Sequence, residues 1–340
     1  MSLRELLTLP IVQAPMAGGG SRPALVAAVS GAGGLGFLAA GYKTAEQVRD
    51  EFVETRSLTS RPFGVNLFVP SAAPVDRAAL AAYQERLAPE AARLGTSLGA
   101  PAGGDDDWDA KVADLLTDPP AVVGFTFGAP ALEIVKAFQD QGVLVVVTVT
   151  AAEEAASVPE ADALCVQGTE AGAHRGSFGN DLGDGLRLLP LLAAVRQVTD
   201  RPLIATGGLG SGGQIAEVLS AGAVAAQLGT AFLRSAESGA HPVHKAALVD
   251  PRFTGTAVTR AFSGRPARGL VNRFMTEHSA SAPAAYPHVH NLTSPLRRAA
   301  ARQQDADAMA LWAGESFRLA TDGPAAGIVT RLADETTRAG

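Results

Sequence analysis

The feature of the sequence that most constrains its fold is a series of short apolar runs that end in small or polar residues. Most of these runs are continuously apolar and rich in β-branched residues, as strands are when both faces are covered. The eight runs are Ile11–Met16, Leu35–Ala40, Phe63–Val69, Val122–Gly128, Leu144–Val149, Ala163–Gly168, Pro202–Gly208 and Ala223–Thr230. Between them lie segments with apolar residues at helical spacing, such as Ala45, Val48 and Phe52.

Strands that alternate with amphipathic helices pair in parallel through right-handed crossovers. Eight such units favour a closed α/β fold, the (β/α)8 TIM barrel, over an open doubly wound sheet. At 340 residues the chain exceeds a typical barrel of about 250 residues. We therefore predict a barrel made of residues 1–238 and 297–340, with a smaller cap domain, 239–296, inserted after the eighth strand. In this prediction a helix over Arg297–Phe317 and the tail close the barrel.

Two intervals between strands are longer than one strand–helix unit requires. After the third strand we predict an extra helix at about Val75–Leu94, followed by the stretch Gly103-Gly-Asp-Asp-Asp107. After the sixth strand the excess is a polar, glycine-rich loop from Thr169 to Gly185. Because barrels carry function in the loops at the carboxyl ends of their strands, this loop is a candidate site.

Composition and charge argue against several classes of function. A formal net charge of −6 and sparse basic clusters do not fit a nucleic-acid interface. The single cysteine, Cys165, lies in an apolar run and is expected to be an inert core thiol. The pairs His241/His244 and His288/His290 lack nearby Cys, Asp or Glu, so we expect no metal site. With no signal-peptide pattern and no apolar run of spanning length, we expect a cytoplasmic protein.

Glycines at two strand ends predict a phosphate site. Thr206-Gly-Gly-Leu-Gly210 follows the seventh strand, and Gln227-Leu-Gly-Thr230 ends the eighth. In phosphate-binding barrels the loops after these two strands hold the anion, because glycine lets backbone N–H groups approach it closely. Tight turns would explain either cluster alone, whereas both together favour phosphate.

The loop after the sixth strand carries the candidate catalytic residue, His174, within Gln167-Gly-Thr-Glu-Ala-Gly-Ala-His-Arg-Gly176. An imidazole titrates near neutrality and therefore suits proton abstraction from a carbon acid. Its small neighbours leave room for a substrate and a flat ring. A surface histidine is the alternative, but the position at a strand end, opposite the phosphate loops, favours the functional one.

Three further strand positions are candidates for contacts to a flavin ring. Ala14-Pro-Met16, at the end of the first strand, can supply backbone donors and an apolar wall. Asn66 is a polar amide inside an apolar strand and must find hydrogen-bond partners, which the edge of an isoalloxazine provides. Gln167 carries the same argument. A purely structural hydrogen bond stays open for both amides.

Together these motifs resemble the nitronate monooxygenase family, also called 2-nitropropane dioxygenases. The resemblance runs through Ala14-Pro-Met16, Gly64-Val-Asn66, Glu170-Ala-Gly-Ala-His174, Ala205-Thr-Gly-Gly208, Gln227-Leu-Gly-Thr230, Gly264-Arg-Pro-Ala-Arg-Gly269, Thr293-Ser-Pro-Leu-Arg297 and Leu311-Trp-Ala-Gly314. It implies an FMN-dependent oxidoreductase without a metal. Such an enzyme converts alkyl nitronates, for example propionate 3-nitronate, and O2 into carbonyl compounds and nitrite.

The resemblance also implies roles for individual residues. His174 would deprotonate a neutral nitroalkane or hold the nitronate. The residues that match FMN contacts of the family are Ala14, Pro15, Met16, Asn66, Gln167, Gly172, Gly207, Gly208, Gln227, Leu228, Gly229 and Thr230. The implied partners are a small nitronate or nitroalkane and O2, in a monomer or homodimer, with neither nucleic acid nor membrane.

Two residues depart from the family pattern. Ala173 replaces the second glycine of the usual Glu-Ala-Gly-Gly-His, which costs roughly 1 kcal/mol if that residue needs a positive φ. Glu315 stands where Gln is usual after Trp-Ala-Gly, and a carboxylate there needs a charge partner if it is buried.

Two other functions stay open at this point. One is an NAD(P)H-dependent FMN reductase, of quinones or of an enoyl thioester, on the same barrel. The other is a non-catalytic flavin-binding module. A separate Rossmann domain is disfavoured, because Gly31-Ala-Gly-Gly-Leu-Gly36 precedes its strand instead of following it.

Overall fold

The computed structural model describes residues 3–71, 74–181, 183 and 185–340. The first two residues of the predicted barrel and two residues of the predicted 169–185 loop lie outside this range. All eight predicted strands are present, somewhat shorter than expected, in one parallel sheet. They are β1 (Ile11–Gln13), β2 (Phe37–Ala39), β3 (Gly64–Phe68), β4 (Val122–Thr126), β5 (Leu144–Val149), β6 (Ala163–Gln167), β8 (Leu203–Thr206) and β9 (Ala225–Leu228).

The sheet closes on itself. Its strand order is β1-β9-β8-β6-β5-β4-β3-β2, so β1 and β2 are the two edges. A parallel bridge between Val12 and Leu35 joins these edges. The amide of Leu35 donates to the carbonyl of Ile11 at 3.0 Å, and the amide of Gln13 donates to the carbonyl of Leu35 at 2.9 Å. The predicted (β/α)8 barrel is therefore confirmed.

Helices surround the barrel and bury one apolar face each against the strands. They are α2 (Pro23–Gly31), α3 (Ala45–Leu58), α5 (Trp108–Thr117), α6 (Leu132–Gln139), α7 (Ala152–Ala156), α8 (Leu188–Arg196), α9 (Gly212–Ser220) and α13 (Ala325–Ala339). Hydroxyl caps start two of them, Thr44 before α3 and Ser211 before α9. The short helix α1 (Leu3–Leu6) packs with residues at the amino ends of the strands, so the opposite, carboxyl end is left for a site.

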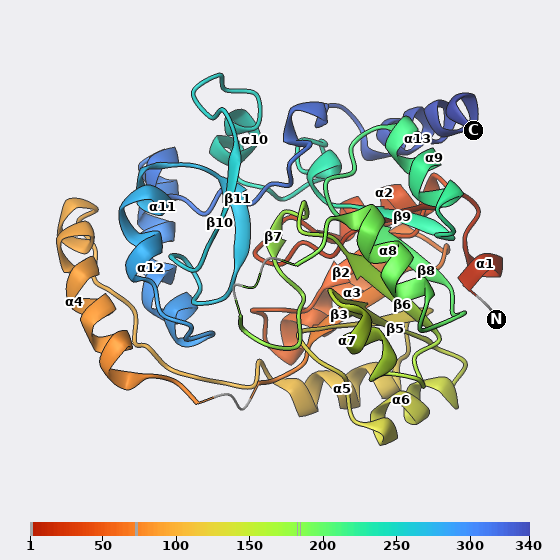
Figure 1. Cartoon of the computed structure of the whole chain (residues 1–340), viewed down its shortest axis with the longest axis horizontal. Coiled ribbons are helices and arrows are strands. Elements are labelled where there is room, and N and C mark those ends of the chain that lie inside the picture. Colours follow the sequence, from red (N-terminus) through yellow and green to blue (C-terminus); the bar gives the residue numbers. More distant parts are fainter. Residues whose placement is uncertain (1–2, 72–73, 182, 184) are drawn as a thin grey trace.

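A second apolar cluster lies beside the barrel, on the left of Figure 1. It contains α4 (Arg77–Arg93), α10 (Pro242–Ala247), α11 (Arg273–His278) and α12 (His288–Arg302). The predicted extra helix is thus confirmed as α4. Because the cluster draws on residues 80–94 and 233–320, it is wider than the predicted cap of 239–296. We call this cluster with its helices the outer unit.

The predicted helix over Arg297–Phe317 is wrong. Helix α12 starts earlier, at His288, and stops at Arg302, where Gln304 takes a φ of +56° that a right-handed helix does not allow. Short 3-10 turns follow. The helix that returns to the barrel is α13, which packs against both α9 and α2 (Figure 1).

A small antiparallel sheet joins the barrel to the outer unit. Its order is β10 (Thr256–Thr259), β11 (Ala267–Leu270) and β7 (Ala173–His174). Ala267 pairs with His174 and Arg268 with Ala173, so the loop after the sixth barrel strand is fixed to the outer unit. The sequence analysis did not predict this sheet, because a two-residue strand has no periodic pattern.

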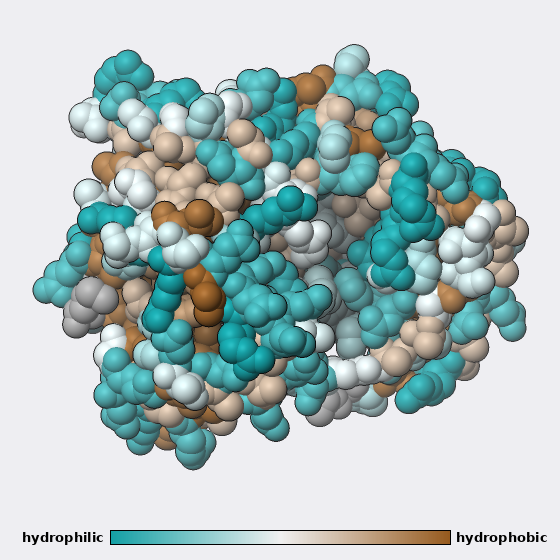
Figure 2. Space-filling view, turned by 180° about the vertical axis from the view of Figure 1, so that it is seen from behind, coloured by the Kyte–Doolittle hydropathy of each residue, from teal (hydrophilic) through white to brown (hydrophobic). Residues whose placement is uncertain are grey.

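The surface seen in Figure 2 is mainly hydrophilic, with scattered apolar residues, and it is hollowed near its middle. None of the helices in the described residues combines the length and the apolar character needed to cross a bilayer.

Candidate active site

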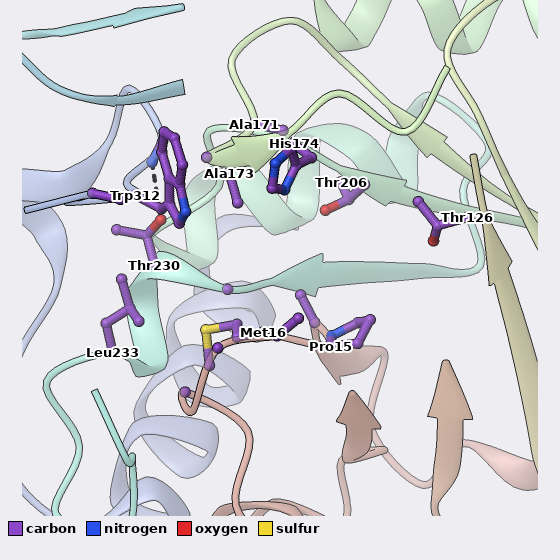
Figure 3. Close-up of a pocket in the computed structure, with 18 of the residues that line it drawn as sticks. Pro15, Met16, Thr126, Ala171, Ala173, His174, Thr206, Thr230, Leu233 and Trp312 are labelled. Atoms are coloured by element: carbon purple, nitrogen blue, oxygen red, sulfur yellow. Dashed lines mark hydrogen bonds between the residues drawn. The ribbon is translucent and has the colours of Figure 1, made fainter. Parts of the chain in front are cut away.

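A cavity of about 320 Å³ lies at the carboxyl ends of the barrel strands and is lined by the barrel and the outer unit together. Figure 3 shows His174 and Ala173 on one side of it, Pro15 and Met16 on the opposite side, and Trp312 with Leu233 at one end. All candidate residues from the sequence line this cavity: Ala14, Pro15, Met16, Asn66, Gln167, Gly172, His174, Gly207, Gly208, Gln227, Leu228, Gly229 and Thr230. Their roles stay predictions.

The sequence analysis missed several other residues that line the cavity. Those with polar, charged or aromatic side chains include Tyr42, Phe68, Phe127, Ser263, His290, Arg297 and Trp312. Phe127 directly follows β4 and Tyr42 comes three residues after β2, so the rule that function lies at strand carboxyl ends would have found them. His290 and Arg297 come from α12 of the outer unit, and nothing local in the sequence places that helix over the barrel.

His174 sits in an aromatic enclosure. Its ring centroid lies 5.9 Å from that of Phe127, 5.8 Å from that of Tyr286 and 5.7 Å from that of Trp312. The Nε2 atom lies 2.8 Å from the hydroxyl of Ser263, and the hydrogen bond takes either direction depending on the tautomer. The hydroxyl thus fixes the ring and leaves Nδ1 for the cavity.

Burial lowers the pKa of His174 to about 3, and the positive charges of Arg265 and Arg297 add to this effect. The imidazole is therefore neutral over the physiological range. A neutral ring with so low a pKa is a poor base for an uncharged substrate. It is a good hydrogen-bonding partner for an anion that brings its own negative charge.

Two arginines make this end of the cavity positive: Arg297, which lines it, and Arg265, which lies over the ring of Phe127. Arg297 donates to the ring Nδ1 of His290 at 3.3 Å and to its carbonyl at 3.0 Å. Arg265 lies 4.0 Å above the ring of Phe127 and donates to backbone carbonyls, including that of Gly179 at 3.0 Å. Within the described ranges neither guanidinium forms an ion pair with a carboxylate. Burial lowers the pKa of each to about 10, which reflects an uncompensated positive charge.

The two candidate amides differ in how many of their hydrogen-bonding groups the protein itself already uses. The amide of Gln167 is used within the protein: its nitrogen donates to the carbonyl of His174 at 3.2 Å, and its oxygen accepts from the amide of Gly176 at 2.7 Å. It therefore shapes the His174 loop. Asn66 is 5% exposed; its oxygen accepts from Thr126 at 3.2 Å, while its nitrogen has only a 3.5 Å contact to a neighbouring carbonyl. Asn66 thus keeps a donor for a ligand.

The glycines after β8, together with Gly172 in the loop after β6, form a cradle in which side chains do not fit. Gly207 and Gly208 have φ of +127° and +68°, and a Cβ on Gly208 would come within 2.7 Å of the Cβ of Glu170. A Cβ on Gly172 would lie 2.5 Å from the amide of Gly314. Such a concave backbone surface beside open space matches the phosphate site expected from the sequence. The residues present therefore fit a phosphate-bearing cofactor.

Both departures from the family pattern are explained by their surroundings. Ala173 has a φ of +63°, so the position does take the left-handed conformation that glycine would adopt without strain. Glu315 is about one third exposed and contacts two arginines, Arg187 at 3.1 Å and Arg268 at 3.4 Å. These two arginines compensate the charge of Glu315, and Arg187 also forms an ion pair with Glu170 at 3.3 Å.

The fold and the cavity define a (β/α)8 barrel enzyme with a glycine cradle, a neutral histidine and a positively charged end of the cavity. The sequence profile described as nitronate monooxygenase matches residues 2–335. The chain therefore belongs to the nitronate monooxygenase family, and it is an oxidoreductase.

Individual relatives agree with this assignment. A nitronate monooxygenase of Pseudomonas aeruginosa is 41% identical over 96% of this chain and 95% of its own length. A probable nitronate monooxygenase of Staphylococcus aureus is 36% identical, covering 98% and 96%. The solved structure of a nitroalkane oxidase from Streptomyces ansochromogenes superposes with a TM-score of 0.97 at 55% identity, covering 99% and 98% of the two chains. FabK from Thermotoga maritima is more distant, with a TM-score of 0.76 at 27% identity, covering 98% and 94%.

Proposed function

We propose that this protein is an FMN-dependent enzyme that oxidises alkyl nitronates with O2, yielding a carbonyl compound and nitrite. The observation that carries the proposal is the juxtaposition of a glycine cradle with an aromatic-walled, positively charged cavity around a neutral histidine. A nitronate is a small anion, and it would compensate the charge that the protein leaves unpaired at Arg297 and Arg265. The family membership supports the same chemistry.

In this proposal FMN would be held by the backbone around Gly208 and Gly229, with Pro15 and Met16 against the ring and the amide of Asn66 at its edge. Bound there, FMN supplies the redox chemistry by taking electrons from the nitronate and passing them to O2. The chain's own residues bind and orient the substrate and exclude water.

His174 has the role of an anchor. Because its pKa is about 3, taking a proton from a neutral nitroalkane would be uphill by several kcal/mol more than for a free histidine. Ser263 holds Nε2, and Nδ1 donates to a nitronate oxygen in the tautomer in which the Ser263 hydroxyl donates to Nε2 and not to the carbonyl of Arg265, 3.2 Å away. Arg297 provides the charge. The protein thus prefers a preformed nitronate over the neutral nitroalkane.

An anaerobic titration tests the proposal. The purified protein is expected to be yellow and to release FMN on denaturation. Mixing it with a nitronate in the absence of O2 should bleach the flavin absorbance, while NADH should leave it unchanged. Bleaching by NADH alone would move the protein to the reductase alternative. A colourless preparation that does not respond to added FMN would refute any flavin function.

A substitution tests the role of His174. His174→Asn should reduce kcat/KM for neutral nitroalkane and for preformed nitronate by similar factors, because both lose the same hydrogen bond. The matched control is His288→Asn, on the same helix as His290 but outside the cavity lining. A loss with the neutral nitroalkane at least tenfold greater than with the nitronate would make His174 a base instead.

A further inference from the structure

One wall of the cavity depends on a tyrosine with an unusual backbone. Tyr42 has a φ of +67°, a conformation that non-glycine residues rarely adopt. Its ring stacks on that of His290, with centroids 3.9 Å apart and planes 10° from parallel. Its hydroxyl accepts a hydrogen bond from that of Tyr286 at 3.3 Å, and its ring centroid is 6.5 Å from that of His174. Tyr42 thus forms part of the substrate end.

The backbone of this tyrosine is held from a segment far away in the sequence. The amide of Tyr42 donates to Oδ1 of Asp106 at 2.9 Å. The next residue of that segment, Asp107, accepts from the amide of Ala45 at 3.2 Å through Oδ2. Asp106 and Asp107 themselves have φ of +61° and +54°. Three left-handed residues in two hydrogen-bonded segments persist where the surrounding structure over-determines them, and such clusters are typical of functional sites.

A buried lysine fixes the carboxylate. Lys111, on α5, is 1% exposed, and its Nζ lies 2.8 Å from Oδ2 of Asp106. An unpaired ammonium at this depth is strongly unfavourable, so the ion pair keeps the carboxylate in place. Helix α5 packs against α3 and α6 of the barrel, so the ion pair is tied to the barrel frame. The carboxylate then presents its other oxygen to Tyr42.

We propose that Asp106, oriented by Lys111, is a positioning residue that holds Tyr42 in its left-handed conformation and so sets the cavity wall that faces His174. Without the hydrogen bond, residue 42 relaxes toward a negative φ. Because rotation about φ redirects the Cα–Cβ bond, the ring then leaves His290. The effect on turnover rests on the proposed function, whereas the effect on the position of Tyr42 does not.

Fluorine NMR tests the positional part. The chain has three tyrosines, so labelling the flavin-loaded protein with 3-fluorotyrosine gives three resonances, and Tyr42→Phe assigns the one that matters. Asp106→Ala should shift the resonance of Tyr42, with a smaller effect on Tyr286, and should leave that of Tyr83 in place. The control Asp109→Ala removes an exposed carboxylate nearby and should move none. An unmoved Tyr42 resonance, or a shift of all three together, overturns the proposal.

A double-mutant cycle tests the functional part. Asp106→Ala should lower kcat/KM for the nitronate about tenfold in the native chain but less than twofold when Tyr42 is already alanine. Equal losses in both backgrounds overturn a role through Tyr42. Asp106→Asn with Lys111→Met serves as the conservative variant, because it retains an acceptor for the Tyr42 amide without leaving a buried charge. This variant should keep the native fluorine spectrum and at least half of the activity; loss of either contradicts the proposal.

Discussion

Replacing Arg297 with methionine should leave the stability of the fold almost unchanged while it impairs substrate binding. Burial lowers the pKa of this guanidinium from 12.5 to about 10, which corresponds to an unfavourable free energy of about 3 kcal/mol for holding the charge. The substitution also removes two hydrogen bonds to His290, each contributing about 1.5 kcal/mol because the donor is charged. The two contributions cancel to within about 1 kcal/mol, or about 1–2 °C in Tm for a chain of this size.

Substrate binding should respond much more strongly than stability. If the nitronate compensates Arg297, removing the cation costs about 2–5 kcal/mol, which is a loss of at least about 30-fold in affinity. The assay compares urea unfolding in the absence of substrate with KM for a nitronate. Arg298→Met is the matched control: Arg298 is the next residue of α12, is exposed, and among the described residues hydrogen bonds to Ser294. Both of its values should remain near those of the native protein.

The two measurements test different statements. A variant less stable than the native protein by several kcal/mol would mean that Arg297 contributes more to packing and hydrogen bonding than its buried charge costs. An unchanged KM would mean that the substrate does not meet this cation, and it would refute the assignment of Arg297 as the anion-binding group.

Three further predictions follow from the backbone and the buried histidines. Ala173→Gly should raise the free energy of unfolding by up to about 1 kcal/mol in urea titrations, because relief of the positive φ outweighs the added chain entropy; a destabilised variant would contradict this. Gly208→Ala should reduce flavin retention at least tenfold on gel filtration while circular dichroism stays native, whereas Gly213→Ala, where a Cβ meets nothing within 4 Å, should retain it. Burial lowers the pKa of His174, His244 and His290 to about 3, 4 and 2, so the unfolded chain binds more protons below pH 6.5 and stability falls as the pH falls. From pH 7.5 to 5.0 each of these histidines should lower the free energy of unfolding by about 2 kcal/mol. His290→Phe should therefore lose about 2 kcal/mol less than the native protein over this range. An unchanged pH dependence in that variant would exclude His290 as a cause of the loss.

The barrel was predictable because its signals are local. Each strand is a continuous apolar run ended by glycine or a polar residue, and closure then follows from their number. Once eight parallel strands are assigned, geometry alone gathers their carboxyl ends, so His174, Asn66 and Gly208 fall into one cavity without any contact information.

The outer unit was not predictable in the same way. His288 and His290 were considered only as a pair of metal ligands, but residues two apart on a helix face different directions. The relevant spacing is between His290 and Arg297, two turns apart on one face of α12, and they hydrogen bond there. The prediction of a helix that begins at Arg297 leaves His290 outside that helix, so the contact between the two residues could not be expected. The hydrogen bond between Asp106 and Tyr42 could likewise not be predicted from the sequence, because the two residues lie 64 positions apart.

The pairing of β7 with β11 has a consequence for biosynthesis. The hydrogen-bond partner of His174, Ser263, is 89 positions further along the chain, and the strand beside His174 follows it. When the ribosome has synthesised the barrel strands up to β9, it has therefore not yet synthesised Ser263 and β11, which contact His174. Contacts of such long range form late in folding. A product that ends after β9 would consequently lack the partners that fix His174, and it would also lack α13, which completes the packing around the barrel.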